Sequence, residues 1–144
     1  VNTKALNAAA GSLTDTTYAL PSSTNIWDAT GNQFNWDNGG MEIGDACIIR
    51  FDIEYTVNTA NDSFDLMMDF AVGGDFPFTL PITHINIDQS GTIQLNYYLN
   101  FFIGSADVLN NPAELYITAD SASDSIQVNG WFVEVKPRTM RVVA

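Results

Sequence analysis

The sequence predicts an all-β protein, a two-sheet antiparallel jelly-roll sandwich with an extended N-terminal arm. Three observations lead to this prediction. Residues 47–57 alternate apolar and polar side chains with a period of two, as a strand with one buried face does. Residues 92–103 carry the longest such alternation. Turn-forming Gly, Asn and Pro separate the alternating segments, and no segment has a convincing helical period.

The first predicted elements follow one another from residue 26. Residues 26–29 form a short strand before a Thr-Gly-Asn turn, and residues 47–57 form a long one that puts Arg50 on the wet face. Residues 64–72 form the next strand. The Asn-Asp-Ser sequence at 61–63 predicts that these two long strands make a hairpin.

The second half of the chain continues the pattern. Two prolines bracket a short edge strand around residues 78–80. Residues 92–103 are predicted to be a central strand because their alternation is the longest, and residues 115–119 form another strand. In the last strand, residues 125–135, the apolar parity changes, which predicts a bulge at Gly130.

The first 25 residues form a predicted N-terminal arm. They are small, polar and nearly aperiodic, with Leu6, Leu13, Tyr18 and Leu20 as scattered apolar anchors. Such a segment frays unless a partner holds it, so we expect these anchors to contact another chain. The chain then divides into the arm, 1–25, and a jelly-roll domain, 26–144, with a basic C-terminal tail.

Length and composition fit one compact domain. The chain has 144 residues, of which 46% are hydrophobic and 12% aromatic, enough for a real core. Cys47 is the only cysteine, so no disulfide can form within the chain. It falls on the apolar side of its strand, where a thiol acts as a small hydrophobic group.

The charge is strongly acidic and unevenly placed. A formal net charge of -12 excludes nucleic acid and anionic membranes as favourable partners, and no apolar run is long enough for a membrane-spanning helix. Lys136, Arg138 and Arg141 cluster near the C-terminus. They are either a docking segment for an acidic surface or a solvated tail.

No catalytic or cofactor-binding constellation is evident. The one histidine, His84, lies among isoleucines, which predicts a structural imidazole at a strand end. One His and one Cys do not make a usual zinc site. Asp28, Asn32 and Asp37 are oxygen ligands that leave a calcium site open as an alternative, although their spacing matches no EF-hand. We therefore expect no enzymatic activity, no metal and no cofactor.

Several large aromatic residues fall in loops or on nominally wet strand faces. Burial between subunits would explain them, and so would loops of the same chain that fold back over them. Both alternatives stay open for Trp27, Phe34, Trp36, Tyr98 and Phe102.

Three stretches carry a family resemblance. They are residues 41–45 (MEIGD) before the strand with Arg50 and Phe51, residues 111–117 (NPAELYI), and residues 131–135 (WFVEV). Together they resemble the tumour-necrosis-factor-like jelly rolls of tailed-phage virions, over about residues 26–136.

The resemblance implies a mechanical role. Proteins of this kind serve as trimeric capsid decoration proteins, head fibres or tail-fibre tips. This sequence has no collagen-like repeat or heptad repeat to form a shaft, which looks more like a decoration protein. The expected partners are the major capsid protein and two further copies of this chain, on the outside of the capsid. The alternative is a fibre tip that binds a host glycan or protein.

Overall fold

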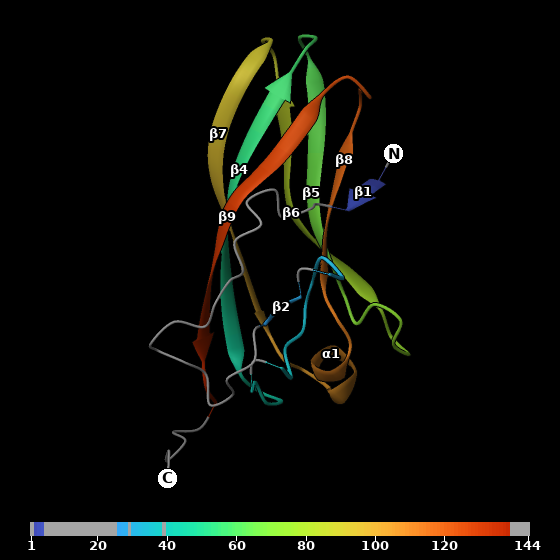
Figure 1. Ribbon diagram of the computed structural model, residues 1–144, viewed down its shortest axis with the longest axis vertical. Helices are drawn as coiled ribbons and strands as arrows, with labels where there is room; N and C mark the ends of the chain where they lie inside the picture. Colours follow the sequence, from blue (N-terminus) through green and yellow to red (C-terminus); the bar gives the residue numbers. More distant parts are fainter. Residues whose placement is uncertain (1, 5–25, 29, 39, 139–144) are drawn as a thin grey trace.

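The structure is a computed structural model that describes residues 2–4, 26–28, 30–38 and 40–138, with side chains from residue 26 onward. Among these residues there are nine strands and one short helix (Figure 1). In chain order they are β1 Asn2–Lys4, β2 Trp27–Asp28, β3 Gln33–Phe34, β4 Ala46–Val57, β5 Asp62–Phe70, β6 Phe78–Ile87, β7 Gly91–Phe102, α1 Ala106–Asn110, β8 Glu114–Ala119 and β9 Ser125–Lys136.

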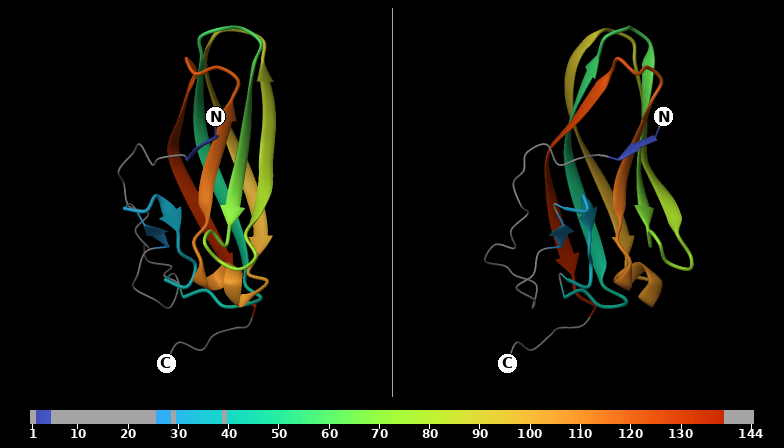
Figure 2. Two further views of the ribbon diagram at one scale, coloured as in Figure 1. Left: turned by 90° about the vertical axis from the view of Figure 1, so that its right-hand side faces the viewer. Right: turned by 45° about the vertical axis from the view of Figure 1, so that its right-hand side comes forward.

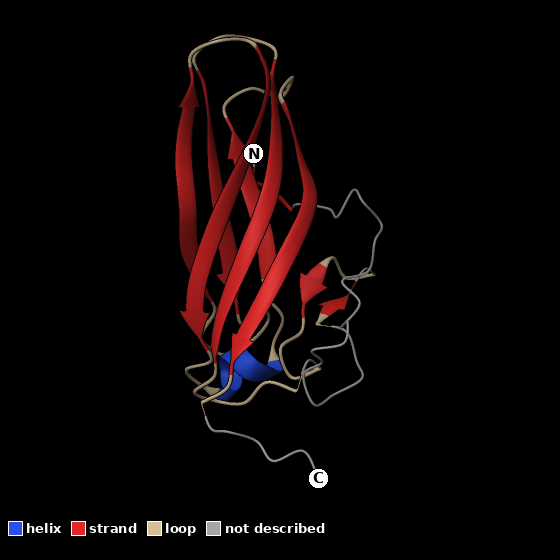
Figure 3. Cartoon of the chain, turned by 90° about the vertical axis from the view of Figure 1, so that its left-hand side faces the viewer, coloured by secondary structure: helices blue, strands red, loops and turns tan. Residues whose placement is uncertain are grey.

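Two antiparallel sheets pack face to face, as the sequence predicts for a sandwich (Figure 2). Sheet A has the strand order β1-β8-β5-β6, and sheet B has the order β7-β4-β9. The strands β2 and β3 form a separate two-stranded ribbon beside the sandwich. The short helix α1 lies at one end of the sandwich (Figure 3).

The core lies between the two sheets, where the predicted alternation is confirmed. Every second residue of β4 is buried, from Cys47 to Val57, and β5 buries Phe64, Leu66, Met68 and Phe70. Burial of each such side chain stabilises the fold by about 1.5–3 kcal/mol before the entropy cost of folding. Burial raises the pKa of the Cys47 thiol to about 12, so this group stays protonated.

Two predicted strand arrangements are wrong. The strands β4 and β5 belong to different sheets, so the connection at residues 58–61 crosses the sandwich instead of closing a hairpin. The strand β7 is an edge strand of sheet B, although its sequence predicts a central one. Its core-facing side chains are therefore mostly half-buried, and only Leu99 is buried in that strand.

The predicted edge strand and the predicted bulge are both present. The prolines mark β6 as an edge strand, as expected, but it runs on to Ile87, with a register shift opposite Leu66 and Met67. In β9 the register shifts where Asp52 pairs with Gly130 and the next residue of β4 pairs with Val128. This confirms the predicted bulge, and Asn129 is its extra residue.

The predicted N-terminal arm is only partly described. Asn2–Lys4 form β1, which pairs with β8 at the edge of sheet A, so these residues belong to the sandwich and not to an arm outside it. Residues 5–25, and with them the anchors Leu6, Leu13, Tyr18 and Leu20, lie outside the described residues.

The β2–β3 ribbon covers one side of the core with aromatic side chains. A β-bridge from Phe34 to Ala113 attaches it to the chain just before β8. Trp27 lies 4.7 Å from Trp131 and Phe34 lies 5.5 Å from Trp36, as measured between ring centroids. Trp27, Phe34 and Trp36 are all buried. Of the two alternatives left open for them, the structure favours coverage by loops of the same chain.

Candidate interaction surface

Cross-strand register gathers large side chains on the outer face of sheet B. Arg50 pairs with Tyr98 on one side and with Phe132 on the other, so the three side chains form one row across the sheet. Four residues before Arg50 along β4, Ala46 pairs with Phe102. We call this set the aromatic patch: Ile48, Arg50, Tyr98, Phe102 and Phe132.

The aromatic side chains of the patch are exposed. Tyr98, Phe102 and Phe132 are 60%, 67% and 61% exposed. A single exposed aromatic ring is ordinary, but here three lie on one half of one sheet face, around Arg50 and Ile48. Exposed apolar surface of this kind marks a binding site more often than a random part of a protein surface does.

Local contacts fix the orientation of the patch. The Nε atom of Arg50 donates to Asp52 Oδ1 at 2.8 Å, and this hydrogen bond is the main reason that the pKa of Arg50 is raised. The ring of Phe102 lies against Gly104, where an added Cβ would come within 3.1 Å of it. The patch is therefore a preorganised surface on a rigid sheet, which lowers the entropy cost of binding.

The patch is electrically balanced within a strongly acidic chain. Arg50 in the patch and Lys136 at its margin contribute two positive charges, and Asp52 and Glu134, also at its margin, contribute two negative ones. Lys136 Nζ lies 3.9 Å from Glu134 Oε1. The whole chain carries -12, so the rest of the surface is far more acidic than this region.

The other half of the same face is polar. Gln94 Nε2 donates to Glu54 Oε2 at 2.8 Å, and the hydroxyls of Thr56 and Thr92 lie 3.3 Å apart. These pairs are the usual way in which an exposed sheet face is hydrated. The contrast shows that the aromatic patch is confined to the half that contains the start of β4.

A second exposed aromatic site lies in the loop between β5 and β6. Phe76 is 77% exposed, and its neighbour Phe78 is 42% exposed. The carboxylate of Asp107 in α1 accepts hydrogen bonds from the backbone N–H groups of Asp75 at 3.1 Å and Phe76 at 2.8 Å. We call residues 75–78 the Phe76 finger. It presents an aromatic ring on a clamped loop with carboxylates at its base.

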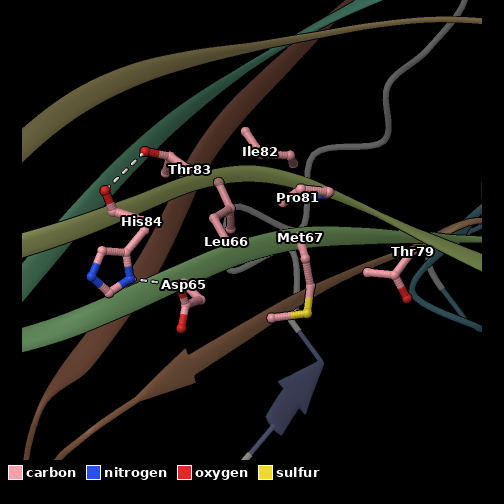
Figure 4. Close-up of a pocket in the computed structure, with 8 residues that line it drawn as sticks. All are labelled: Asp65, Leu66, Met67, Thr79, Pro81, Ile82, Thr83 and His84. Carbon is pink, nitrogen blue, oxygen red and sulfur yellow. Dashed lines mark hydrogen bonds and ion pairs between the residues drawn. The ribbon is translucent and has the colours of Figure 1, made fainter.

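A hollow lies over β5 and β6 (Figure 4). It has a volume of about 350 Å³ and is lined by Asp65, Leu66, Met67, Thr79, Pro81, Ile82, Thr83 and His84. His84 Nδ1 lies 2.7 Å from Asp65 Oδ1. His84 is exposed and within β6, so the predicted position at a strand end is wrong.

The chemistry of this hollow is limited. An Asp–His pair orients an imidazole, but covalent catalysis also needs an activated nucleophile beside it. The lining hydroxyls have other partners: Thr79 donates to Asp69, and Thr83 donates to the carbonyl of His84. The one thiol, Cys47, is buried in sheet B.

The open calcium alternative gains no support. Asp28 already accepts hydrogen bonds from the N–H groups of Thr30 at 2.8 Å and Gly31 at 3.1 Å, so its carboxylate shapes the turn between β2 and β3. Asp37 accepts from the N–H of Asn38. Within the described part of the chain, no group of three or more His, Cys, Asp or Glu residues is placed to hold a metal ion.

The basic tail is only partly described. Arg138 is exposed, but its backbone N–H donates to the buried Asp45 at 2.8 Å, and its side chain lies against Gly44. This contact ties the end of β9 to the start of β4. Lys136 lies at the margin of the aromatic patch. Arg141 lies outside the described residues.

Sequence reasoning found Tyr98, Phe102 and Lys136 but missed Phe132 and the Phe76 finger. The parity of β9 contains the signal for Phe132, because a bulge that turns Trp131 inward turns Phe132 outward. Phe76 follows Gly73 and Gly74 in a loop without periodicity, so no sequence pattern points to it.

Comparisons add no relative to this description. Among residues 2–4, 26–28, 30–38 and 40–138, no helix has the length and apolar character needed to cross a bilayer. No family model, no curated protein and no solved structure matches the chain. The aromatic patch and the Phe76 finger are therefore the features from which function must be argued.

Proposed function

We propose that the protein is a non-enzymatic structural protein of a phage virion, a homotrimeric decoration protein that binds the outside of the capsid and stabilises it. The observation that carries this proposal is the aromatic patch. A rigid sandwich that holds three aromatic side chains exposed is suited to bury them against another protein surface.

The strand pairing supports the jelly-roll form of this proposal. In a jelly roll a long antiparallel hairpin wraps around itself, so the strands pair in a nested order. Here β5 pairs with β6, β4 pairs with β7, and β1 pairs with β8. This is the order of a nested hairpin, with β9 placed on the free side of β4.

The polar groups of the molecule favour a structural role over catalysis. Several carboxylates with described contacts serve turns and loops: Asp28 holds a turn, Asp45 holds the end of β9, and Asp107 holds a loop. Buried and semi-buried carboxylates used in this way stabilise connections. A protein that withstands strain at a capsid surface needs such connections.

The test is binding to capsid shells that lack the protein. Purified protein is mixed with such shells and sedimented, and the heat stability of the shells is measured with and without it. We expect saturable binding and a raised disruption temperature, because a ligand that binds only the intact shell stabilises it. Gln94→Ala, on the polar half of the same sheet, is the matched control and should bind like the wild type.

Failure to bind any shell, or binding without a change in shell stability, would count against decoration. A specific observation then favours a receptor-binding fibre tip. Tyr98 lies between Asn96 and Asn100 on one strand face, and an exposed ring flanked by amides suits a sugar. Binding of the isolated protein to host-surface glycans, abolished by Tyr98→Ala, would support this alternative.

A further inference from the structure

The aromatic patch and the Phe76 finger differ in the charges around them. These charges determine which kind of partner each site can bind. The Phe76 finger has the carboxylates of Asp75 and Asp107 at its base. Asp69 lies on the neighbouring strand, where it pairs with Thr79. Two copies of a chain with a net charge of -12 repel one another, so the acidic finger is unsuited to contact a second copy.

The aromatic patch differs because its charges cancel. Arg50 and Lys136 balance Asp52 and Glu134, so two copies that approach through the patch bring no net charge together. The composition also fits a contact between proteins. Aromatic residues and Arg are enriched at such interfaces, and Arg50 stands in a row between Tyr98 and Phe132.

We propose that the aromatic patch is the surface through which copies of this chain contact one another. The inference deepens the proposed function, because it names the contact that would hold the homotrimer together. It needs no capsid for its test. In a trimer each copy would turn Tyr98 and Phe132 toward a common axis and bury them there.

The size of the patch sets the strength that we expect. Its outline is about 15 Å in each direction, from a strand spacing of about 4.8 Å and a rise of about 3.4 Å per residue. A standard interface buries about 800 Å² on each partner, so the patch forms only the centre of a contact with a polar rim. We therefore expect dissociation constants of about 1–100 µM.

The experiment is sedimentation velocity of the full chain from about 1 to about 500 µM, a range that brackets this affinity. Wild type should pass from monomer to oligomer as concentration rises. Phe132→Ser should weaken association by about tenfold or more, because centrally placed aromatic residues dominate interface energy. Phe76→Ser removes an even more exposed ring outside the patch and should associate like the wild type.

A charge variant separates electrostatics from apolar burial. Arg50→Glu leaves one positive and three negative charges in the patch and at its margin, so association should weaken, most strongly at low salt. Added salt should partly restore association of Arg50→Glu and should not restore that of Phe132→Ser. Far-ultraviolet circular dichroism of each variant checks that the fold is retained.

The outcomes are distinct. A wild-type chain that stays monomeric throughout the range overturns the inference, as does a Phe132→Ser variant that associates like the wild type. An oligomer that depends on Phe132 supports the inference, and its mass tests the trimer separately. Shell binding that persists when the oligomer is lost would keep decoration and reject only the trimer.

Discussion

Two groups of aromatic residues look alike in the sequence and differ in the structure. Trp27 and Trp36 belong to the segment that contains the β2–β3 ribbon and are buried, whereas Tyr98 and Phe102 lie on the outer face of sheet B and are exposed. Both groups fall in loops or on nominally wet strand faces, where the sequence predicts contact with water. The two groups differ in burial because the backbone is free to fold back in one region and is fixed by strand pairing in the other.

A segment outside the sheets can fold back and bury its own side chains, but a strand cannot. Trp27 packs on Trp131 because the ribbon folds over the side of the sandwich. Tyr98 has no such freedom, because the parity of β7 directs Leu99 into the core and Tyr98 away from it. An aromatic residue at an outward strand position is therefore a better indicator of a binding surface than one in a loop.

The largest expected effect is on stability, and it tests this comparison directly. Trp36→Ala should lower the free energy of unfolding by about 3–5 kcal/mol, because it leaves a cavity in the core. Tyr98→Ala should change it by about 0.5 kcal/mol or less, since surface substitutions seldom matter more. Urea unfolding followed by circular dichroism measures both.

The unfolding of Trp36→Ala and Tyr98→Ala must be measured on dilute protein, because self-association would stabilise the wild type alone. Equal losses of stability in the two variants would mean that the two groups of aromatic residues do not differ as described. Phe132→Ala provides a second exposed position and should behave like Tyr98→Ala.

A smaller effect should come from the turn that places the ribbon. Asp28→Ala removes the acceptor for the N–H groups of Thr30 and Gly31 and should cost about 1–2 kcal/mol. The ribbon would then cover the core less firmly. All three tryptophans lie in or under this region, so acrylamide should quench their fluorescence more strongly than in the wild type.

Asp37→Ala is the matched control, since Asp37 accepts a hydrogen bond from Asn38 only one residue away. Its quenching should stay at the wild-type level. Unchanged quenching in Asp28→Ala would show that the ribbon is held by its aromatic contacts and does not need the turn.

The smallest expected effect is a pH dependence that neither aromatic group can produce. The hydrogen bond with Asp124 raises the pKa of Asp62 above its usual value, and burial and the charges of Asp124 and Asp120 act in the same direction. The folded state therefore holds this proton more tightly than the unfolded state. Stability should fall as the pH rises from the usual Asp pKa through the raised one.

Asp62→Asn removes this titration while keeping a group that can donate to Asp124. At pH 7 its urea midpoint should be higher than that of the wild type, and the decline with pH should be shallower. A steeper decline in the variant would mean that the two carboxyl groups do not share a proton.

Local sequence patterns predicted the strands well, but they did not predict which strands pair with one another. The alternation from Cys47 to Val57 identified both the strand and its buried face, because parity depends only on neighbouring residues. The hairpin expected at 61–63 was wrong, because a turn sequence does not say which sheet the next strand joins. The length of alternation likewise could not show that β7 lies at an edge.

The same limit applies to the candidate surface. Tyr98 and Phe102 could be predicted as outward residues from β7 alone. Their neighbours Arg50 and Phe132 come from strands far away in the sequence, and only the observed pairing of β7, β4 and β9 makes one patch of them. The jelly roll and the virion role stay predictions. They rest on the resemblance of three short motifs to phage jelly rolls and on the nested strand pairing.

The bulge in β9 lets the strand hold one extra residue without changing which side chains reach the patch. Asn129 is an extra residue opposite β4, and the residues after it have the reverse parity of those before it. Loss of that one codon would restore a single parity along β9, so Trp131 would still face the core opposite Phe51 and Phe132 would still face outward opposite Arg50. A single in-frame deletion at residue 129 would therefore remove the bulge and leave both the core face and the outer face of β9 with the same side chains.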